Sequence, residues 1–220
     1  MYEEQKKIVF DAAKELLAKG LTLGSSGNIT LRTEKKGTKM IGTPSGKDIV
    51  DYTIDDMLVI EFSESEDKFE VIEGNLTASS ETYLHMAIYK ARKDINAVIH
   101  YHPVYSTALG LVLENELPAI VDDQVFFLGH PIVITSKYAR SGSRELAEHI
   151  SEVVNKTSLA IIIKNHGSLG FGKNMKRAFL SCELLEKTAQ IYYLASMMGK
   201  IKYLDEDAIK MGKAIFKALK

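Results

Sequence analysis

The spacing of hydrophobic residues along the chain predicts a mixture of helices and strands. From Glu4 to Lys19, apolar residues recur on one helical stripe among lysines and glutamates, and Gly20 follows as a helix stop. Further helices are expected at 81–91, 103–112, 144–155, 174–198 and 205–219. Runs rich in β-branched residues predict strands at 29–32, 39–42, 57–62, 68–72, 97–102, 131–135 and 158–164. We expect residues 1–220 to form a single α/β domain, because no repeat, low-complexity tract or proline-rich linker divides them.

One of these strands ends in two histidines. The apolar run Ala97-Val98-Ile99 leads directly into His100-Tyr101-His102. Because side chains in a strand point alternately to opposite faces, both imidazoles project from the same face. Two neutral imidazoles side by side suit a divalent metal ion. The alternative is a pair of half-buried histidines that hydrogen-bond to backbone carbonyls.

A second apolar strand also delivers a histidine. The run from Ser158 to Lys164 is followed by Asn165-His166-Gly167, whose glycine lets backbone or ligand approach closely. Glu81, in the first turn of a predicted helix, adds a carboxylate, although the helix dipole alone explains an acid there. Three neutral nitrogens and one anionic oxygen satisfy a borderline-soft divalent ion and leave a position for substrate. The predicted metal ligands from the strands are His100, His102 and His166.

The remaining histidines favour structural roles. His85 lies one turn after Glu81 on the same helix, where we expect it to be packed or to support a ligand. His130 falls in a predicted loop, and His149 falls on a helix that we expect to be exposed. These three histidines are therefore not predicted as metal ligands.

Three turns rich in small residues are able to bind an anion. They are Gly27-Asn28, Ser45-Gly46 and Ser79-Ser80, the last at the start of a predicted helix. Glycine and asparagine permit positive φ and expose backbone N–H groups, and a helix start attracts anions. An ordinary turn or helix cap also explains each of them. Taken together beside a metal, they favour a phosphate group on the ligand.

Composition excludes several classes of partner. Lysine and arginine number 28 against 29 aspartates and glutamates, without a long block of one sign, so neither nucleic acid nor a membrane is expected as a partner. No segment has the length of a transmembrane span, and the first residues lack a signal-peptide pattern. The single cysteine, Cys182, lies among apolar helix residues and is expected to be small and buried rather than a nucleophile. These features predict a cytoplasmic protein without disulfides.

Five short motifs follow one another along the chain: Gly27-Asn28, Thr43-Pro44-Ser45-Gly46, Ser79-Ser80-Glu81, His100-Tyr101-His102 and Asn165-His166-Gly167. This ordered set resembles the class II aldolase/adducin-head family, and most closely its members that cleave L-fuculose 1-phosphate. The likeness runs from about Gly20 to Met198 and includes the segment from Tyr138 to Leu146. It implies a three-layer α/β/α fold with a central, largely antiparallel sheet. It also implies a homotetramer with active sites between subunits.

The resemblance implies a role for each matching residue. The three strand-end histidines would bind Zn²⁺, with Mn²⁺ or Co²⁺ as alternatives, and Glu81 would be the fourth ligand without substrate and the acid/base during turnover. The substrate phosphate would lie against Gly27, Asn28, Ser45, Gly46, Ser79 and Ser80. The implied reaction is the reversible cleavage of a ketose 1-phosphate to dihydroxyacetone phosphate and an aldehyde, with zinc stabilising the enediolate.

The chain departs from the fuculose-phosphate pattern at two tyrosines. Asp122 stands where those members have a tyrosine after a Pro-Ala-Ile segment, and no tyrosine follows Tyr203. The apolar stretch around Asp122 and Asp123 indicates that they are buried or line a pocket, or form a turn between strands. A buried carboxyl there, with a raised pKa, would be able to transfer a proton. The alternatives are a ribulose-5-phosphate 4-epimerase-like enzyme, a dehydratase or decarboxylase of the family, and a non-catalytic adducin-like head.

Overall fold

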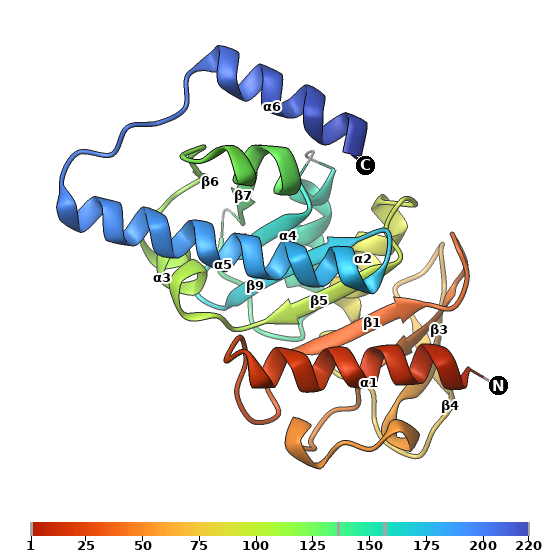
Figure 1. The fold of residues 1–220 in the computed structure, drawn as a ribbon. Coiled ribbons are helices and arrows are strands. Elements are labelled where there is room, and N and C mark those ends of the chain that lie inside the picture. The colour runs from red at the N-terminus through yellow and green to blue at the C-terminus, as the bar shows by residue number, and fades with distance from the viewer. Residues whose placement is uncertain (1, 136, 156–157, 220) are drawn as a thin grey trace.

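The computed structural model describes residues 2–135, 137–155 and 158–219. Within them, nine strands form one sheet that helices cover on both faces (Figure 1). The strands are β1 (Asn28–Arg32), β2 (Lys39–Gly42), β3 (Leu58–Phe62), β4 (Phe69–Glu73), β5 (Ala97–Tyr101), β6 (Glu116–Leu117), β7 (Ile132–Ile134), β8 (Ala160–Ile163) and β9 (Gly167–Gly172). The helices are α1 (Glu3–Ala18), α2 (Thr82–Ala91), α3 (Val104–Val112), α4 (Arg144–Val154), α5 (Met175–Met198) and α6 (Glu206–Leu219), with the short helices η1 (Ile49–Asp51), η2 (Ile54–Asp56) and η3 (Gln124–Leu128).

The sheet is largely antiparallel, as expected. Its strand order is β4-β3-β2-β1-β5-β9-β8-β7-β6, and only the β7–β8 pair is parallel. Both β5 and β8 run antiparallel to β9, which lies between them. They therefore run in the same direction, and their carboxyl ends reach the same edge of the sheet. This topology brings the His100 and His166 segments together.

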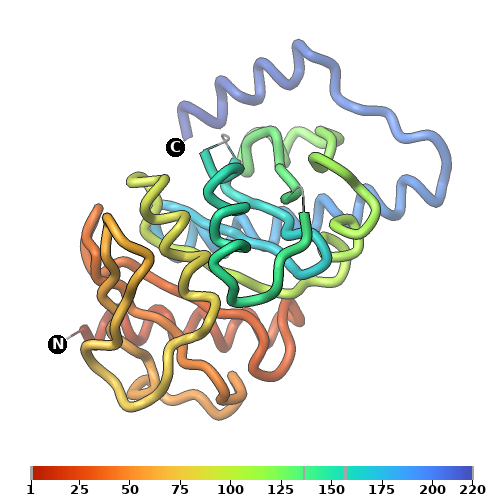
Figure 2. Tube along the Cα trace, turned by 180° about the vertical axis from the view of Figure 1, so that it is seen from behind, coloured from red at the N-terminus to blue at the C-terminus, as the bar shows by residue number. Residues whose placement is uncertain are grey.

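Helices form a layer on each side of the sheet. Helices α1, α3 and α5 cover one face in Figure 1, and α2 and α4 lie in front of the other face in Figure 2. Leu16 of α1 packs in one cluster with Ile99 of β5. Leu84 of α2 and Ile150 of α4 pack in another cluster with Val98. Because side chains alternate along β5, His100 points to the same side as Val98, toward α2.

The sequence-based prediction missed β9. The helices and strands that were predicted are all present, to within two residues of the expected boundaries. Three of the six residues from Gly167 to Gly172 are glycines, which weaken a strand, yet all six residues are buried. A Cβ on Gly170 would lie 2.9 Å from the backbone nitrogen of Cys182, so the absence of a side chain lets α5 pack closely on this strand. Tertiary packing, rather than local propensity, explains β9.

The C-terminal helix α6 returns over η3 at the end of an extended arm (Figure 1). Leu204 in this arm donates a backbone hydrogen bond of 3.0 Å to the carbonyl of Ala119. A Cβ on Gly212 would lie 2.6 Å from Cγ1 of Val125, so the glycine permits close packing of α6 on η3. No helix among the described residues has the length and apolar character needed to cross a membrane.

Candidate active site

Four side chains converge where β5 and β8 end. Nε2 of His100 lies 2.9 Å from Nε2 of His102 and 3.1 Å from Oε2 of Glu81. Nε2 of His166 lies 3.1 Å from Oε1 of Glu81. The four candidate ligand atoms all lie within 4.8 Å of one another. Glu81 and His100 are buried, while His102 and His166 are half-buried at the mouth of the cluster.

The elements of the fold explain how these residues meet. His100 is in β5, and His102 follows that strand on the same face. Glu81 directly precedes α2, whose apolar side packs on that face of the sheet. His166 lies in the turn between β8 and β9 rather than at the tip of β8, because Asn165 has a φ of 58° and reverses the chain there. The sequence predicted the residues, but the hairpin that carries His166 was not expected.

The donor set fits a divalent metal ion. Nδ1 of His100 lies 3.0 Å from the carbonyl oxygen of Ser168, so this nitrogen donates and leaves Nε2 as the free lone pair. Burial lowers the pKa of His102 to about 4, with further lowering by His100 and His166, so this imidazole is neutral at neutral pH. Burial alone raises the pKa of Glu81, but His100 and His166 outweigh it and hold the pKa well below its usual range. Three imidazole nitrogens and one carboxylate are typical zinc ligands.

Replacing Gly167 with alanine is expected to weaken metal binding by about 10- to 100-fold. A Cβ at this position would lie 2.6 Å from the carbonyl oxygen of Tyr101 and 2.6 Å from Cδ2 of His102. Because the carbonyl belongs to a central strand, the imidazole has to move. Titration of metal-free protein with Zn²⁺ measures the change. The control Gly20→Ala strains a backbone at φ 67° but places its Cβ within 4 Å of no other atom, and it is expected to keep wild-type affinity for Zn²⁺. Wild-type affinity in Gly167→Ala would contradict this view of the cluster.

Two further side chains hold Glu81 in place. Nδ2 of Asn28 donates to Oε2 over 3.1 Å, and Oγ of Ser141 donates to Oε1 over 2.9 Å. Each oxygen of the Glu81 carboxylate is therefore fixed by one hydrogen bond. Ser141 was not among the predicted site residues. The available signal was its place in the Tyr138–Leu146 segment of the family resemblance.

The three predicted anion-binding turns lie next to one another. Nδ2 of Asn28 donates to Oγ of Ser79 over 3.2 Å, which joins the first turn to the third. The backbone N–H of Ser45 donates to the carbonyl of Thr77 over 2.8 Å, which joins the second turn to the segment before Ser79. The exposed residues of these turns are Ser45, Gly46 and Ser80. The three turns form a polar rim beside Glu81, and their role in binding a phosphate stays a prediction.

Gly27 has a backbone conformation and a close contact that only a glycine accommodates easily in the first of these turns. Its φ is +82°, a left-handed conformation that favours glycine. A Cβ there would lie 2.8 Å from the carbonyl oxygen of His100, in the strand that carries the metal-ligand candidates. A glycine at this position therefore lets the turn pack directly against β5.

Residues 7–193 match the family model described as Class II Aldolase and Adducin N-terminal domain. The chain belongs to this family. A 5-deoxy-D-ribulose 1-phosphate aldolase from Bacillus thuringiensis serovar kurstaki is 32% identical over 96% of this chain and 94% of its own length. A 3-oxo-tetronate 4-phosphate decarboxylase from Haemophilus influenzae is 28% identical over 94% of each chain. Among solved structures, an L-fuculose 1-phosphate aldolase is 30% identical, with a TM-score of 0.87 over 97% of this chain and 96% of that one.

Family membership confirms three expectations from the sequence. The resemblance to class II aldolases, the three-layer α/β/α fold and the assignment to the metal-dependent lyases are all confirmed. Class II aldolases use a divalent metal, and the cluster of Glu81 and three histidines is suited to hold one. The roles of the individual site residues stay predictions.

Asp122 and Asp123 do not join this class II aldolase cluster within one chain. Both are exposed, and Asp123 pairs with Lys187 of α5 at 3.2 Å. Burial, one of the alternatives expected for them, is wrong, because the apolar residues that follow them form η3, and Val125 and Leu128 take its buried positions. The aspartates lie at the exposed start of the helical segment that continues into η3. In the single chain, neither aspartate therefore has the buried environment that proton transfer was expected to need.

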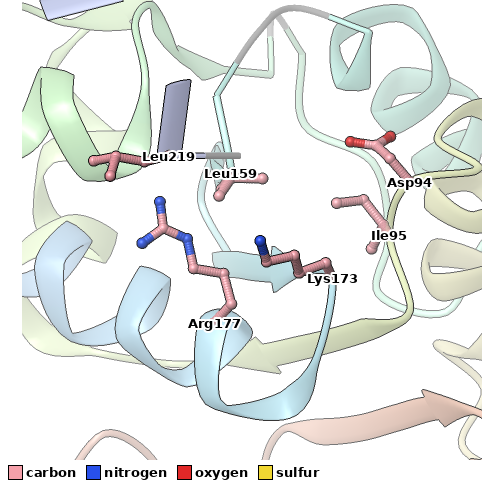
Figure 3. Close-up of a pocket in the computed structure, with 6 residues that line it drawn as sticks. All are labelled: Asp94, Ile95, Leu159, Lys173, Arg177 and Leu219. Carbon is pink, nitrogen blue, oxygen red and sulfur yellow. The ribbon is translucent and has the colours of Figure 1, made fainter. Parts of the chain in front are cut away.

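A separate small cavity lies at the opposite ends of β5 and β9 (Figure 3). It is lined by Asp94, Ile95, Leu159, Lys173, Arg177 and Leu219. Asp94 precedes β5 and Lys173 follows β9, whereas His102 follows β5 and His166 precedes β9. The paired strands β5 and β9 thus separate this cavity, at one of their ends, from Glu81 and the three histidines at the other. The cavity is not part of the candidate site.

Proposed function

We propose that this protein is a zinc-dependent aldolase that reversibly cleaves a ketose 1-phosphate to dihydroxyacetone phosphate and an aldehyde. The observation that carries this proposal is the convergence of Glu81 and three histidines beside a polar rim of three turns. Two of the similar proteins named above, the 5-deoxy-D-ribulose 1-phosphate and L-fuculose 1-phosphate aldolases, act on ketose 1-phosphates and support the substrate class. L-fuculose 1-phosphate or a similar ketose phosphate is the proposed substrate.

The residues of the cluster divide the chemistry between them. A zinc ion held by His100, His102 and His166 would polarise the ketone and its neighbouring hydroxyl and stabilise the charge of the enediolate. In the absence of substrate, Glu81 would complete the ligand set. In the condensing direction the ionised Glu81 would remove a proton from the hydroxymethyl carbon of dihydroxyacetone phosphate, that carbon would bond to the aldehyde carbon, and the aldehyde oxygen would take up a proton to become a hydroxyl. In the cleavage direction that hydroxyl would lose its proton, the carbon–carbon bond would break, and the protonated Glu81 would return its proton to the hydroxymethyl carbon. Asn28 and Ser141 orient both oxygens of Glu81 for this transfer.

Replacing Ser80 with alanine is expected to raise KM for the phosphorylated ketose by about 10- to 100-fold, because a hydrogen bond to a charged group contributes about 1.5–3 kcal/mol. The proposed phosphate contacts are Gly27, Asn28, Ser45, Gly46, Ser79 and Ser80. Ser80 is exposed on the rim, so its substitution does not disturb the buried core. Steady-state kinetics measure the effect, with Ser151→Ala on α4 as an exposed control outside the three turns. An unchanged KM in Ser80→Ala would remove this residue from the phosphate site.

A substrate panel distinguishes the reactions open to this site. The zinc-loaded protein is incubated with ketose 1-phosphates, pentulose 5-phosphates and a 3-oxo acid phosphate, and the products are identified by NMR. Release of dihydroxyacetone phosphate is the expected result. Configurational exchange without cleavage would instead indicate an epimerase. Release of carbon dioxide would indicate a decarboxylase, the activity named for the Haemophilus influenzae relative.

We also propose that the enzyme is a homotetramer with active sites between subunits. Large apolar side chains are exposed at the ends of α3 and α5, where Val112 is 71% and Met198 is 88% exposed. Exposed apolar surface of this kind favours association. In such an assembly Asp122 and Asp123 stay candidates for proton transfer, and normal turnover and pH dependence in both Asp122→Asn and Asp123→Asn would exclude that role. The single buried cysteine, Cys182, supports the cytoplasm as the site of action.

A further inference from the structure

A chain of buried polar side chains leads away from Glu81 beneath β1. Asn28 donates to Glu81, and Oδ1 of Asn28 makes a short hydrogen bond with Nε2 of His85. Nδ1 of His85 lies 2.7 Å from Oγ1 of Thr30, which lies 2.9 Å from the hydroxyl of Tyr89. His85 is 0% exposed, so it does not contact solvent. The proposed reaction gives this histidine no part in the chemistry itself.

The donors and acceptors that each side chain carries determine the direction of the hydrogen bonds that join Glu81, Asn28, His85 and Thr30. Nδ2 of Asn28 has two hydrogens and donates to Ser79 and Glu81 over 3.2 Å and 3.1 Å. Oδ1 of Asn28 is an acceptor only, so Nε2 of His85 has to carry the hydrogen between them. Burial lowers the pKa of His85 to about 3, so the ring is neutral and has one N–H. Nδ1 of His85 is then an acceptor, and the Thr30 hydroxyl donates to it.

This arrangement decides which way the Asn28 amide points. With the His85 ring protonated at Nε2, a rotation of the amide by 180° would turn its oxygen toward the carboxylate of Glu81 and its NH₂ group toward the N–H of His85. Both contacts are repulsive, and they would leave buried polar groups unpaired. A hydrophobic residue at position 85 would remove the donor that prevents this rotation.

We propose that His85 is a positioning residue whose Nε2–H fixes the orientation of the Asn28 amide, and through it the carboxylate of Glu81 and the hydroxyl of Ser79. The inference rests on the proposed function for its link to turnover, because Glu81 and Asn28 act on substrate there. The hydrogen-bond direction that it requires does not depend on the identity of the substrate.

Two variants at position 85 separate positioning from packing. His85→Phe fills the same space without a donor, and kcat is expected to fall by about 10- to 100-fold, the usual effect of losing a group that orients an active-site residue. His85→Gln keeps an N–H near the position of Nε2, and it is expected to restore most of that loss. Ser181→Ala removes another buried hydrogen-bonding side chain, on α5, and is expected to keep wild-type kcat and KM.

A double-mutant cycle tests whether His85 acts through Asn28. In an Asn28→Ala background, His85→Phe is expected to change kcat little, because the amide that it orients is already absent. The same fold-loss in both backgrounds would overturn the proposal. Equal impairment of His85→Gln and His85→Phe would also overturn it, because a donor at this position would then have no effect.

The tautomer of His85 gives a test that needs neither substrate nor a variant with altered folding. The zinc-loaded protein is labelled with ¹⁵N-histidine, and the ring nitrogens are observed by NMR, with His85→Gln used to assign the signal. The expected result is a neutral ring protonated at Nε2. A ring protonated at Nδ1, or at both nitrogens, would overturn the inference. Absence of aldolase activity with the expected tautomer would instead reject the proposed function and leave the hydrogen-bond direction in place.

Discussion

Replacing Glu81 with glutamine is expected to lower kcat by about 100- to 10,000-fold, the usual contribution of a general acid/base. The amide keeps the size of the side chain but has no carboxylate to accept a proton. It also places an NH₂ group toward Asn28 or Ser141, both of which donate to the carboxylate in the wild-type protein. Steady-state kinetics in the cleavage direction measure the effect, and circular dichroism checks the fold.

A matched carboxylate outside the site provides the control for this prediction. Glu73 on β4 accepts a hydrogen bond of 2.7 Å from Lys6, as Glu81 accepts hydrogen bonds from its neighbours. Glu73→Gln is expected to keep wild-type kcat, because Glu73 belongs to a different part of the sheet. Full activity in Glu81→Gln would show that proton transfer at the cluster does not involve this residue.

Removal of the metal is expected to reduce turnover to the background rate, and His100→Ala is expected to do the same. His100 is the most buried of the three histidines, and its Nε2 faces both His102 and Glu81. Its loss would remove a proposed ligand and would also leave Oε2 of the buried Glu81 carboxylate without its neighbouring imidazole, which costs stability, while His166 stays beside Oε1. Metal content by mass spectrometry and activity after addition of Zn²⁺, Mn²⁺ or Co²⁺ measure both effects.

A histidine outside the cluster controls for general damage to the fold. His149 lies on α4 and is not part of the group of candidate ligands. His149→Ala is expected to retain both metal and activity. Equal metal content in His100→Ala and the wild-type protein would contradict the assignment of the cluster as the metal site.

Local patterns in the sequence predicted most of the individual site residues. The alternation of side chains along β5 was sufficient to put His100 and His102 on one face, and the spacing of apolar residues was sufficient to predict α2 behind Glu81. The meeting of His100 with His166 depends instead on β9 lying between β5 and β8. Strand order is a non-local property. The glycines of β9 also gave its sequence no strand pattern, so the strand itself was not predicted.

The errors have a common physical cause. Burial of Asp122 and Asp123 was one of the alternatives suggested by their apolar neighbours, but those neighbours pack inward in η3 and the aspartates stay exposed. The hydrogen bond from Ser141 to Glu81 joins residues 60 positions apart, and no local pattern encodes it. The contacts of His85 with Asn28 and Thr30 likewise appear only when α2 packs on β1. The exposure of the two aspartates and the hydrogen bonds of Ser141 and His85 therefore depend on tertiary contacts, which short-range sequence patterns do not encode.

Deuterium exchange into dihydroxyacetone phosphate tests the central claim most directly, because it needs no knowledge of the aldehyde. In D₂O the zinc-loaded protein is predicted to exchange a hydrogen of the hydroxymethyl carbon, as followed by ¹H NMR, since Glu81 removes and returns that proton. The exchange is predicted to disappear in Glu81→Gln and after treatment with a chelator. Absence of exchange above the buffer rate with the zinc-loaded wild-type protein, or undiminished exchange in Glu81→Gln, would contradict the proposed metal-dependent aldolase.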